Sequence, residues 1–341
     1  MSNLFSKENL FVIAEIGHNH QGLLEKAFKL FDAAKDCGAN AVKLQKRHNS
    51  TLFTNSFFNK PYDHANSYAK TYGKHRQFLE FGMEEYVKLK KYAKKIKIDF
   101  FATPFDLPSL EFLEKLKMPY YKIASADLTN PILQSQIAKT GKHIFLSTGG
   151  GTYKEIDDAK KTIFKFNKKL TILQCTASYP CNFSEMNLNV IKVLKNKYKD
   201  CSIGLSDHEN GIDAGPIAYM LGARVFEKHF TLDRASKGTD HAFSLEPNGL
   251  KKFIRNLKRV DLFLGTSNKS LLKSEEESIN KMRKSIVASQ NLPKGKKINL
   301  SDLAFKAPGD GAKPSDYKFI IGKKTKKAFT QDDLIFKKDV Y

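Results

Sequence analysis

Short hydrophobic segments of strong β character alternate with longer segments of helical periodicity between about residues 10 and 265. Eight segments predict strands, because each is short and rich in β-branched or aromatic residues. They are Phe11–Ile16, Ala41–Leu44, Ile98–Ala102, Tyr120–Ala124, His143–Leu146, Thr171–Gln174, Ser202–Leu205 and Arg224–Phe230. Helical patterns lie between them and after the last, at Leu24–Cys37, Met83–Ile96, Leu107–Leu116, Ile132–Thr140, Tyr153–Phe166, Leu188–Lys197, Ala214–Leu221 and Leu250–Leu264.

Regular alternation of strand and helix predicts a parallel sheet, because a parallel connection needs a crossover. Eight such units in about 250 residues have the size of a (β/α)₈ TIM barrel. A doubly wound open sheet is the alternative. That fold usually carries a glycine-rich phosphate turn after its first strand, whereas "EIGHNHQG" stands there in this chain.

The pattern changes after residue 265. Residues 266–284 are polar and charged and are typical of a linker, and residues 285–341 contain short strands with glycine and proline turns. We therefore predict a catalytic barrel over residues 1–265, a linker over 266–284 and a small β-rich domain over 285–341, which is marginal in size for independent folding.

The connection from Lys46 to Phe81 is far longer than loops usually are, which is typical of functional or disordered segments. It contains "KPYDHANSYAKTYGKHRQFLEFG", which is rich in tyrosine, histidine and basic residues. Disordered segments have few aromatic residues. We interpret it as an ordered lid or substrate loop.

Composition excludes several classes of protein. There is no run of 18 apolar residues, so no membrane span is expected, and Met1–Glu8 lacks the apolar core of a secretory signal. Four cysteines without a CxxC pair indicate a reducing cytoplasm rather than a disulfide framework. The net charge of +22 raises nucleic acid as a partner. Lysines spread over the whole chain account for it better, since base recognition favours arginine, and no nucleic-acid partner is expected.

Polar residues stand at the C-terminal ends of the predicted strands. In a (β/α)₈ barrel these ends share one face, where active sites lie. The residues at or just after the ends are Glu15, Lys43, Gln45, Thr103, Phe105, Lys122, Ser125, Asp127, Ser147, Gln174, Thr176, Tyr179, Ser206, Asp207, His208, Glu227 and His229. Each alone has an ordinary structural explanation, such as a helix cap or a solvated lysine. Together they predict a site, because buried lysine and histidine are costly unless they are paired.

The residue types indicate the chemistry of this face. Two lysines, several hydroxyls and the glycine triplet that begins at Gly149 favour a pocket for phosphate or carboxylate groups. His208 and His229 end neighbouring strands and favour a divalent metal with open coordination positions.

At this point the chain resembles the sialic acid synthases, which condense phosphoenolpyruvate with an N-acylated sugar. The matching stretches are "AEIGHNHQG", "AVKLQK", "YKIAS", "LSTGG", "QCTASYP", "IGLSDH", "EKHF" and "KGTDHAFSLEP", followed by "KSIVASQNLPKGKKINLSDLAFKAPGDG", which is similar to the antifreeze-like SAF domain of that family. The resemblance covers essentially the whole chain. It implies a TIM barrel followed by a SAF domain, and a domain-swapped homodimer in which the SAF domain covers the partner's barrel.

The resemblance also implies the reaction and the roles of individual residues. Phosphoenolpyruvate would condense with N-acetylmannosamine, its 6-phosphate or a 2,4-diacetamido sugar, releasing phosphate and using Mn²⁺ or Mg²⁺. The phosphoenolpyruvate pocket corresponds to Lys43, Thr103, Lys122, Ser125, Ser147 and Ser206; the metal ligands to His208 and His229; and the sugar side, with the candidate proton donor Glu15, to Glu15, Gln45, Phe105, Asp127, Tyr179 and Asp240.

Some positions depart from the family pattern. Asp127 stands where bacterial relatives typically have glutamate, Ala177 where they have asparagine, and Ala307, beside Lys306, where their SAF domain has arginine. These differences leave the sugar open. The basic segment Lys70–Arg76 is as compatible with a sugar-phosphate site as with an exposed loop. Two alternatives also stay open: another phosphoenolpyruvate-dependent sugar-acid synthase, against which the SAF-like tail argues, and a catalytically silent sugar-binding relative.

Overall fold

The computed structural model describes residues 9–341, so the prediction that Met1–Glu8 is no secretory signal falls outside the described residues. The chain divides into two compact units, residues 1–265 and 266–341. Within residues 9–341, no helix combines the length and the apolar character needed to cross a membrane.

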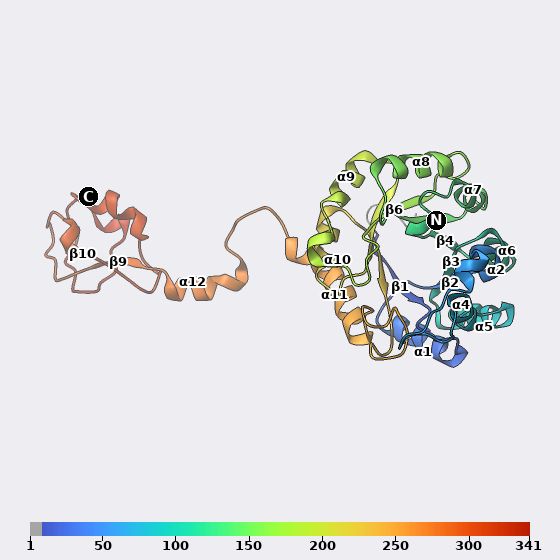
Figure 1. The fold of residues 1–341 in the computed structure, drawn as a ribbon. Helices are drawn as coiled ribbons and strands as arrows, with labels where there is room; N and C mark the ends of the chain where they lie inside the picture. Colours follow the sequence, from blue (N-terminus) through green and yellow to red (C-terminus); the bar gives the residue numbers. More distant parts are fainter. Residues whose placement is uncertain (1–8) are drawn as a thin grey trace. The chain divides into compact units, whose positions relative to one another are not determined.

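The first unit is a closed barrel of eight parallel strands, in which each strand pairs with the next and β8 pairs with β1 (Figure 1). The strands are β1 (Phe11–Gly17), β2 (Ala41–Lys46), β3 (Asp99–Pro104), β4 (Tyr120–Ile123), β5 (His143–Ser147), β6 (Leu170–Cys175), β7 (Ser202–Asp207) and β8 (Val225–His229). The predicted (β/α)₈ barrel is confirmed. Strands β2, β3 and β7 run two residues further than predicted, because backbone pairing continues after the hydrophobic side chains end.

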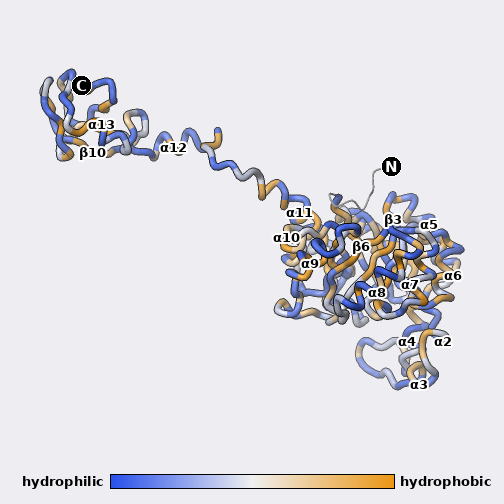
Figure 2. Tube along the Cα trace, turned by 90° about the horizontal axis from the view of Figure 1, so that it is seen from above, coloured by the Kyte–Doolittle hydropathy of each residue, from blue (hydrophilic) through white to orange (hydrophobic). Residues whose placement is uncertain are grey.

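Eight helices follow the strands and surround the barrel (Figure 1). They are α1 (Leu24–Asp36), α5 (Met83–Ile96), α6 (Leu107–Lys115), α7 (Pro131–Lys139), α8 (Tyr153–Phe164), α9 (Val190–Lys197), α10 (Ala214–Leu221) and α11 (Pro247–Leu264). Their apolar faces pack on the outward side chains of the strands, such as Val12 and Ala14 of β1. Figure 2 shows the hydrophobic residues concentrated in this unit.

Alternation along the strands separates two kinds of interior. Successive side chains of a strand point to opposite faces, so every second residue enters the barrel. A small apolar cluster fills one part of the interior and includes Phe11, Phe101, Phe145 and Leu173. Two residues after Phe101, Phe145 and Leu173 stand Thr103, Ser147 and Cys175, at the C-terminal end of the barrel, and these residues line the site described below.

The long connection after β2 is ordered, as predicted. It contains three short helices, α2 (Asn49–Leu52), α3 (Asn55–Phe58) and α4 (Tyr72–Phe78), which project from the barrel in Figure 2. Stacked and edge-on aromatic contacts, such as Tyr68 with Phe78 at 4.9 Å between ring centroids, hold the segment together. Aromatic packing explains its order without a long helix or strand.

The second unit has its own core. Strands β9 (Ser285–Ala288) and β10 (Leu303–Lys306) pair antiparallel, and the short helices α12 (Glu276–Met282) and α13 (Tyr317–Ile320) belong to the same unit. The segment predicted as a linker therefore contains a helix. Lys306 Nζ lies 2.5 Å from Asp332 Oδ1, so this lysine is paired within its own unit.

Candidate active site

A cavity of about 580 Å³ opens at the C-terminal ends of the barrel strands. This volume is typical of small-molecule sites. All the predicted site residues except Asp127 line it: Glu15, Lys43, Gln45, Thr103, Phe105, Lys122, Ser125, Ser147, Tyr179, Ser206, His208, His229 and Asp240. Seven of the eight strands carry at least one of them, which explains why sequence neighbours alone do not reveal the site.

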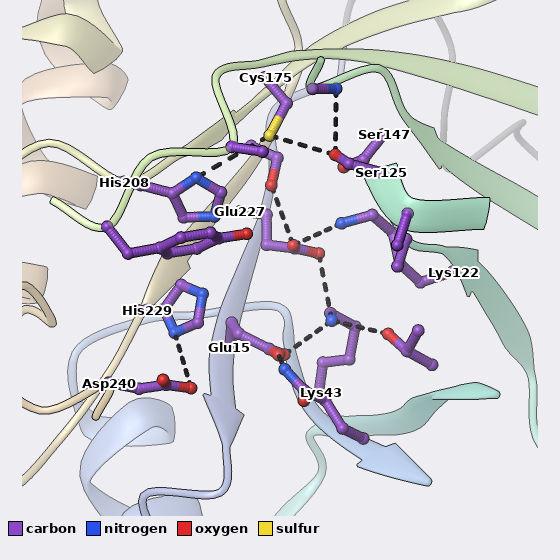
Figure 3. Close-up of a pocket in the computed structure, with 18 of the residues that line it drawn as sticks. Glu15, Lys43, Lys122, Ser125, Ser147, Cys175, His208, Glu227, His229 and Asp240 are labelled. Carbon is purple, nitrogen blue, oxygen red and sulfur yellow. Dashed lines mark hydrogen bonds and ion pairs between the residues drawn. The ribbon is translucent and has the colours of Figure 1, made fainter. Parts of the chain in front are cut away.

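Four buried charges form the floor of the cavity (Figure 3). Lys43 Nζ lies 2.8 Å from Glu15 Oε2 and 3.7 Å from Glu227 Oε2, and Lys122 Nζ lies 2.5 Å from Glu227 Oε1. Glu227 therefore faces both lysines. Sequence analysis placed Glu227 at the end of a strand but assigned it no role. It stands two residues before His229, on the same face of β8, and this spacing could have identified it as a site residue.

The two carboxyl groups of the floor have opposite pKa shifts. Burial raises the pKa of Glu15, and Lys43 offsets only part of the rise. Burial also acts to raise the pKa of Glu227, but Lys122 and Lys43 outweigh it and hold the pKa at about 2. Two neighbouring carboxyl groups whose pKa values are shifted in opposite directions suit different catalytic roles. Glu15 is able to carry a proton, whereas Glu227 stays ionised beside the two lysines.

Hydroxyl groups surround the two lysines. Lys43 Nζ donates to Thr103 Oγ1 at 2.9 Å, and Ser206 Oγ donates to Glu227 Oε1 at 3.1 Å. Ser147 Oγ is buried and has no hydrogen-bond partner. A buried hydroxyl without a partner is costly unless a ligand or water completes it, so Ser147 indicates a position for a polar ligand atom beside the lysines.

His208 and His229 lie side by side, with ring centroids 5.3 Å apart. The Nδ1 of His208 donates to the carbonyl oxygen of Thr176 at 2.8 Å, which leaves Nε2 as the nitrogen with a free lone pair. Burial lowers the pKa of His229 to about 4, so this ring is neutral at physiological pH, and its Nδ1 has no hydrogen-bond partner. Two imidazoles with available nitrogens fit a divalent cation.

The rest of a metal coordination sphere is not provided by side chains. Within residues 9–341, no group of three or more histidine, cysteine, aspartate or glutamate side chains is arranged to hold a metal ion. Asp240 Oδ2 lies 3.9 Å from His229 Nδ1, which is too far for a hydrogen bond. A cation held by the two histidines would therefore keep positions open for substrate or water.

Four polar residues at strand ends do not line the cavity: Asp127, Gln174, Thr176 and Asp207. Asp127 is absent from its lining: it accepts a hydrogen bond from Asn130 Nδ2 at 3.0 Å. Asp207 lies on the outward face of β7, where its Oδ2 is 2.7 Å from Nζ of the fully buried Lys228. The placement of Asp207 and Lys228 follows from alternation, because each precedes an inward-facing histidine, whereas Asp127 lies in a 3-10 turn after β4. The expectation that all polar strand ends share one face is wrong for these four residues.

The rim of the cavity holds two arginines: Arg47, which was not predicted as a site residue, and Arg76, which belongs to the basic segment considered as a sugar-phosphate site. Arg47 stands two residues after Gln45, which in turn stands two residues after Lys43, so the alternation of β2 continues into the loop. Arg76 comes from α4 in the long connection. Of the basic segment Lys70–Arg76, the structure thus brings only Arg76 to the cavity, while Lys70 and Lys74 are exposed.

Comparisons with known proteins agree with this geometry. Residues 30–269 match the NeuB family and residues 283–340 match the SAF domain. The chain is 36% identical over 335 residues to the N-acetylneuraminate-9-phosphate synthase of Mus musculus, covering 98% of this chain and 93% of the relative. It is 37% identical over 330 residues to the N,N'-diacetyllegionaminic acid synthase of Campylobacter jejuni, covering 95% and 98%.

A solved structure gives the same result. The N-acetylneuraminic acid (sialic acid) synthetase from Leptospira borgpetersenii, crystallised in complex with citrate, superposes with a TM-score of 0.69 at 34% identity, over 80% of this chain and 91% of that chain. The similarity therefore extends from sequence to the fold that positions the cavity.

Proposed function

Since this chain belongs to the NeuB family, we propose that it is a synthase that condenses phosphoenolpyruvate with an N-acylated hexose. The product is a nine-carbon 2-keto sugar acid, and inorganic phosphate is released. The relatives are named as synthases of N-acetylneuraminate 9-phosphate and of N,N'-diacetyllegionaminic acid. Because these products differ in their sugar, the proposal at this point concerns the class of reaction and not one particular sugar.

The observation that carries the proposal is the pair of buried lysines around Glu227. Phosphoenolpyruvate has two anionic groups, a carboxylate and a phosphate, and preorganised cations in a dry cavity stabilise such charge strongly. Lys43 and Lys122 are 3% exposed and are fixed by Glu227 before any ligand enters. Ser147 Oγ offers a further donor without a partner. The two lysines and the free hydroxyl therefore match the two anionic groups of the ligand.

The same residues suit the bond changes of the reaction. The C3 carbon of phosphoenolpyruvate attacks the aldehyde carbon of the open-chain sugar, and C2 becomes an oxocarbenium-like centre that takes up water. Loss of phosphate from C2 then leaves the 2-keto acid. Glu15, whose pKa is raised by burial, is placed to give a proton to the aldehyde oxygen or to receive one from the incoming water. Lys43 and Lys122 hold the phosphate until it leaves.

We further propose that His208 and His229 hold Mn²⁺ or Mg²⁺. Such an ion would supply Lewis-acid polarisation of the aldehyde oxygen. The chain's own contribution is to hold the His208 ring through the carbonyl of Thr176 and to place the His229 ring beside it. Tyr179 lies beside the histidine pair, with its ring centroid 4.2 Å from that of His208 and 6.2 Å from that of His229.

The first test is phosphate release from phosphoenolpyruvate with Mn²⁺ present. We expect release with one of N-acetylmannosamine, N-acetylmannosamine 6-phosphate and the 2,4-diacetamido hexoses, and none when the sugar is omitted. Mass spectrometry of the product checks that the sugar has gained three carbons. Binding of a sugar without release in any mixture would favour a silent relative over a synthase.

We propose that the protein acts as a homodimer in which the SAF domain of one subunit covers the barrel of the other. The barrel cavity is open, and Tyr179 on its wall is 55% exposed. Deleting residues 285–341 is expected to raise KM for the sugar by about tenfold or more, since the loss of one or two interface hydrogen bonds is worth about 1–3 kcal/mol. Steady-state kinetics and sedimentation of both forms measure the effect. A truncated barrel with unchanged sugar KM would contradict this capping role.

A further inference from the structure

Two guanidinium groups share the rim of the cavity without a carboxylate partner. Arg47 and Arg76 both line the cavity. Among the described residues, no carboxylate oxygen lies within 4.0 Å of either side chain, whereas Lys43 and Lys122 on the floor are both in ion pairs. The nearby acidic residue Glu80 already has partners: Glu80 Oε2 pairs with Lys46 Nζ at 3.0 Å and accepts a hydrogen bond from the backbone N–H of Arg47 at 3.2 Å.

Neutral groups hold the two arginines in place. Arg47 Nη2 donates to Gln45 Oε1 at 2.7 Å, and its guanidinium lies 3.8 Å from the centroid of the Phe105 ring. Arg76 Nε donates to the hydroxyl of Tyr72 at 3.1 Å. These contacts fix both planes but use few of the five N–H donors of each guanidinium. The remaining donors are available to a ligand.

His18 separates the two cations. Its Nε2 lies 3.3 Å from Arg47 Nη1, and its Nδ1 lies 3.3 Å from Arg76 Nη1. Burial and the two arginines lower the pKa of His18 well below its ordinary value, so the ring stays neutral. A neutral spacer keeps two like charges close without contact, although they repel each other. Glu80 and Asp240 offset part of this repulsion at longer range, and a dianion between the arginines would offset it directly.

The arginines lie at the rim of the cavity, and the phosphoenolpyruvate lysines lie on its floor. Lys43, Gln45 and Arg47 follow each other at every second position of β2 and the loop after it. At about 3.3 Å per residue, Lys43 and Arg47 are separated by roughly 13 Å along the chain. That separation leaves room for an open-chain hexose whose aldehyde faces the floor and whose far end faces the arginines.

We propose that Arg47 and Arg76 form a phosphate subsite, and that the acceptor is an N-acyl hexose phosphorylated at its terminal carbon. This inference rests on the proposed synthase function and specifies its substrate class. Arginine binds phosphate through two parallel hydrogen bonds, which makes a pair of fixed guanidinium groups selective for a terminal phosphate monoester over a hydroxyl.

The test compares kcat/KM for N-acetylmannosamine 6-phosphate with kcat/KM for N-acetylmannosamine, using the full-length protein with Mn²⁺. The wild type is expected to prefer the phosphorylated sugar. Arg47→Met and Arg76→Met are each expected to lower this preference by about 10- to 100-fold, because a hydrogen bond to a charged group contributes about 1.5–3 kcal/mol. Thermal melting checks that both variants fold. Calorimetric titration of N-acetylmannosamine 6-phosphate alone measures the loss of binding without turnover.

Lys74→Met is the matched control, because Lys74 lies on the same helix α4 as Arg76 but is exposed and outside the cavity. The preference of this variant is expected to match the wild type. The phosphate subsite is overturned if the wild type prefers the unphosphorylated sugar, if neither arginine variant changes the preference, or if Lys74→Met changes it equally. All three results leave the synthase function standing. Absence of phosphate release with every sugar would instead remove the premise.

Discussion

Turnover by the His229→Ala variant is expected to fall by roughly 10³-fold or more, corresponding to about 4 kcal/mol of lost transition-state stabilisation. His229 is one of the two imidazoles proposed to hold the metal, and its Nδ1 makes no hydrogen bond that the fold would lose. The substitution therefore removes a ligand while it leaves β8 paired on both sides. Phosphate release at saturating Mn²⁺ measures the effect.

Metal binding separates this role from a general loss of activity. Titration with Mn²⁺, followed by electron paramagnetic resonance of the free ion, should show weaker binding by His229→Ala than by wild type. His64→Ala is the control, since His64 is exposed and lies outside the cavity. Unchanged Mn²⁺ affinity in His229→Ala, or full turnover, would contradict the assignment of His229 as a ligand.

The Lys122→Met variant is expected to lose both activity and stability. Removing one preorganised cation from the phosphoenolpyruvate pocket should lower kcat/KM by about 10²- to 10³-fold, a range typical of a lost electrostatic stabiliser. It also deprives Glu227 of its closest partner, at 2.5 Å. Breaking a buried ion pair by removing one partner costs about 3–5 kcal/mol. Denaturant unfolding and steady-state kinetics measure the two effects separately.

A double variant distinguishes the stability effect from the catalytic one. In Lys122→Met/Glu227→Gln the buried carboxylate is also gone, so much of the unfolding free energy should return while activity stays low. Lys197→Met removes an exposed lysine that pairs with Asp157 at 2.6 Å, and it should change the unfolding free energy by only about 0–1 kcal/mol. If the double variant recovered activity together with stability, Lys122 would be structural and not part of the pocket.

The alternation of strands and helices was sufficient to predict the barrel. Eight β-rich segments, each followed by a helical pattern, allow few other closed arrangements. Convergence of the polar strand ends follows from that topology, because parallel strands end on one face. Lys43, Lys122, His208 and His229 could therefore be predicted to meet although nearly 190 residues separate the first from the last. The sugar-side residues rested on the resemblance to a family instead.

Which charged side chains pair with one another could not be predicted from the sequence. The neighbouring residues Glu227, Lys228 and His229 look alike as charged ends of one strand, yet the middle one points outward to Asp207 and the others point inward. The face that each residue takes depends on strand register, and one residue of shift would exchange them. The role of Glu227 appeared only once β4, β2 and β8 had placed both lysines against it.

The architecture, the face of the site and its main chemical groups follow from the amino-acid sequence, because periodicity and the order of elements are local properties of the chain. Which charges neutralise one another, and which stay available, depends on the folded arrangement of the side chains. Arg47 and Arg76 show the reason: they are distant in the chain, and their lack of carboxylate partners depends on distances set by the packing of α4 against the barrel rim. Coulomb energies depend on separation and burial in space, and neither is encoded in residue order alone.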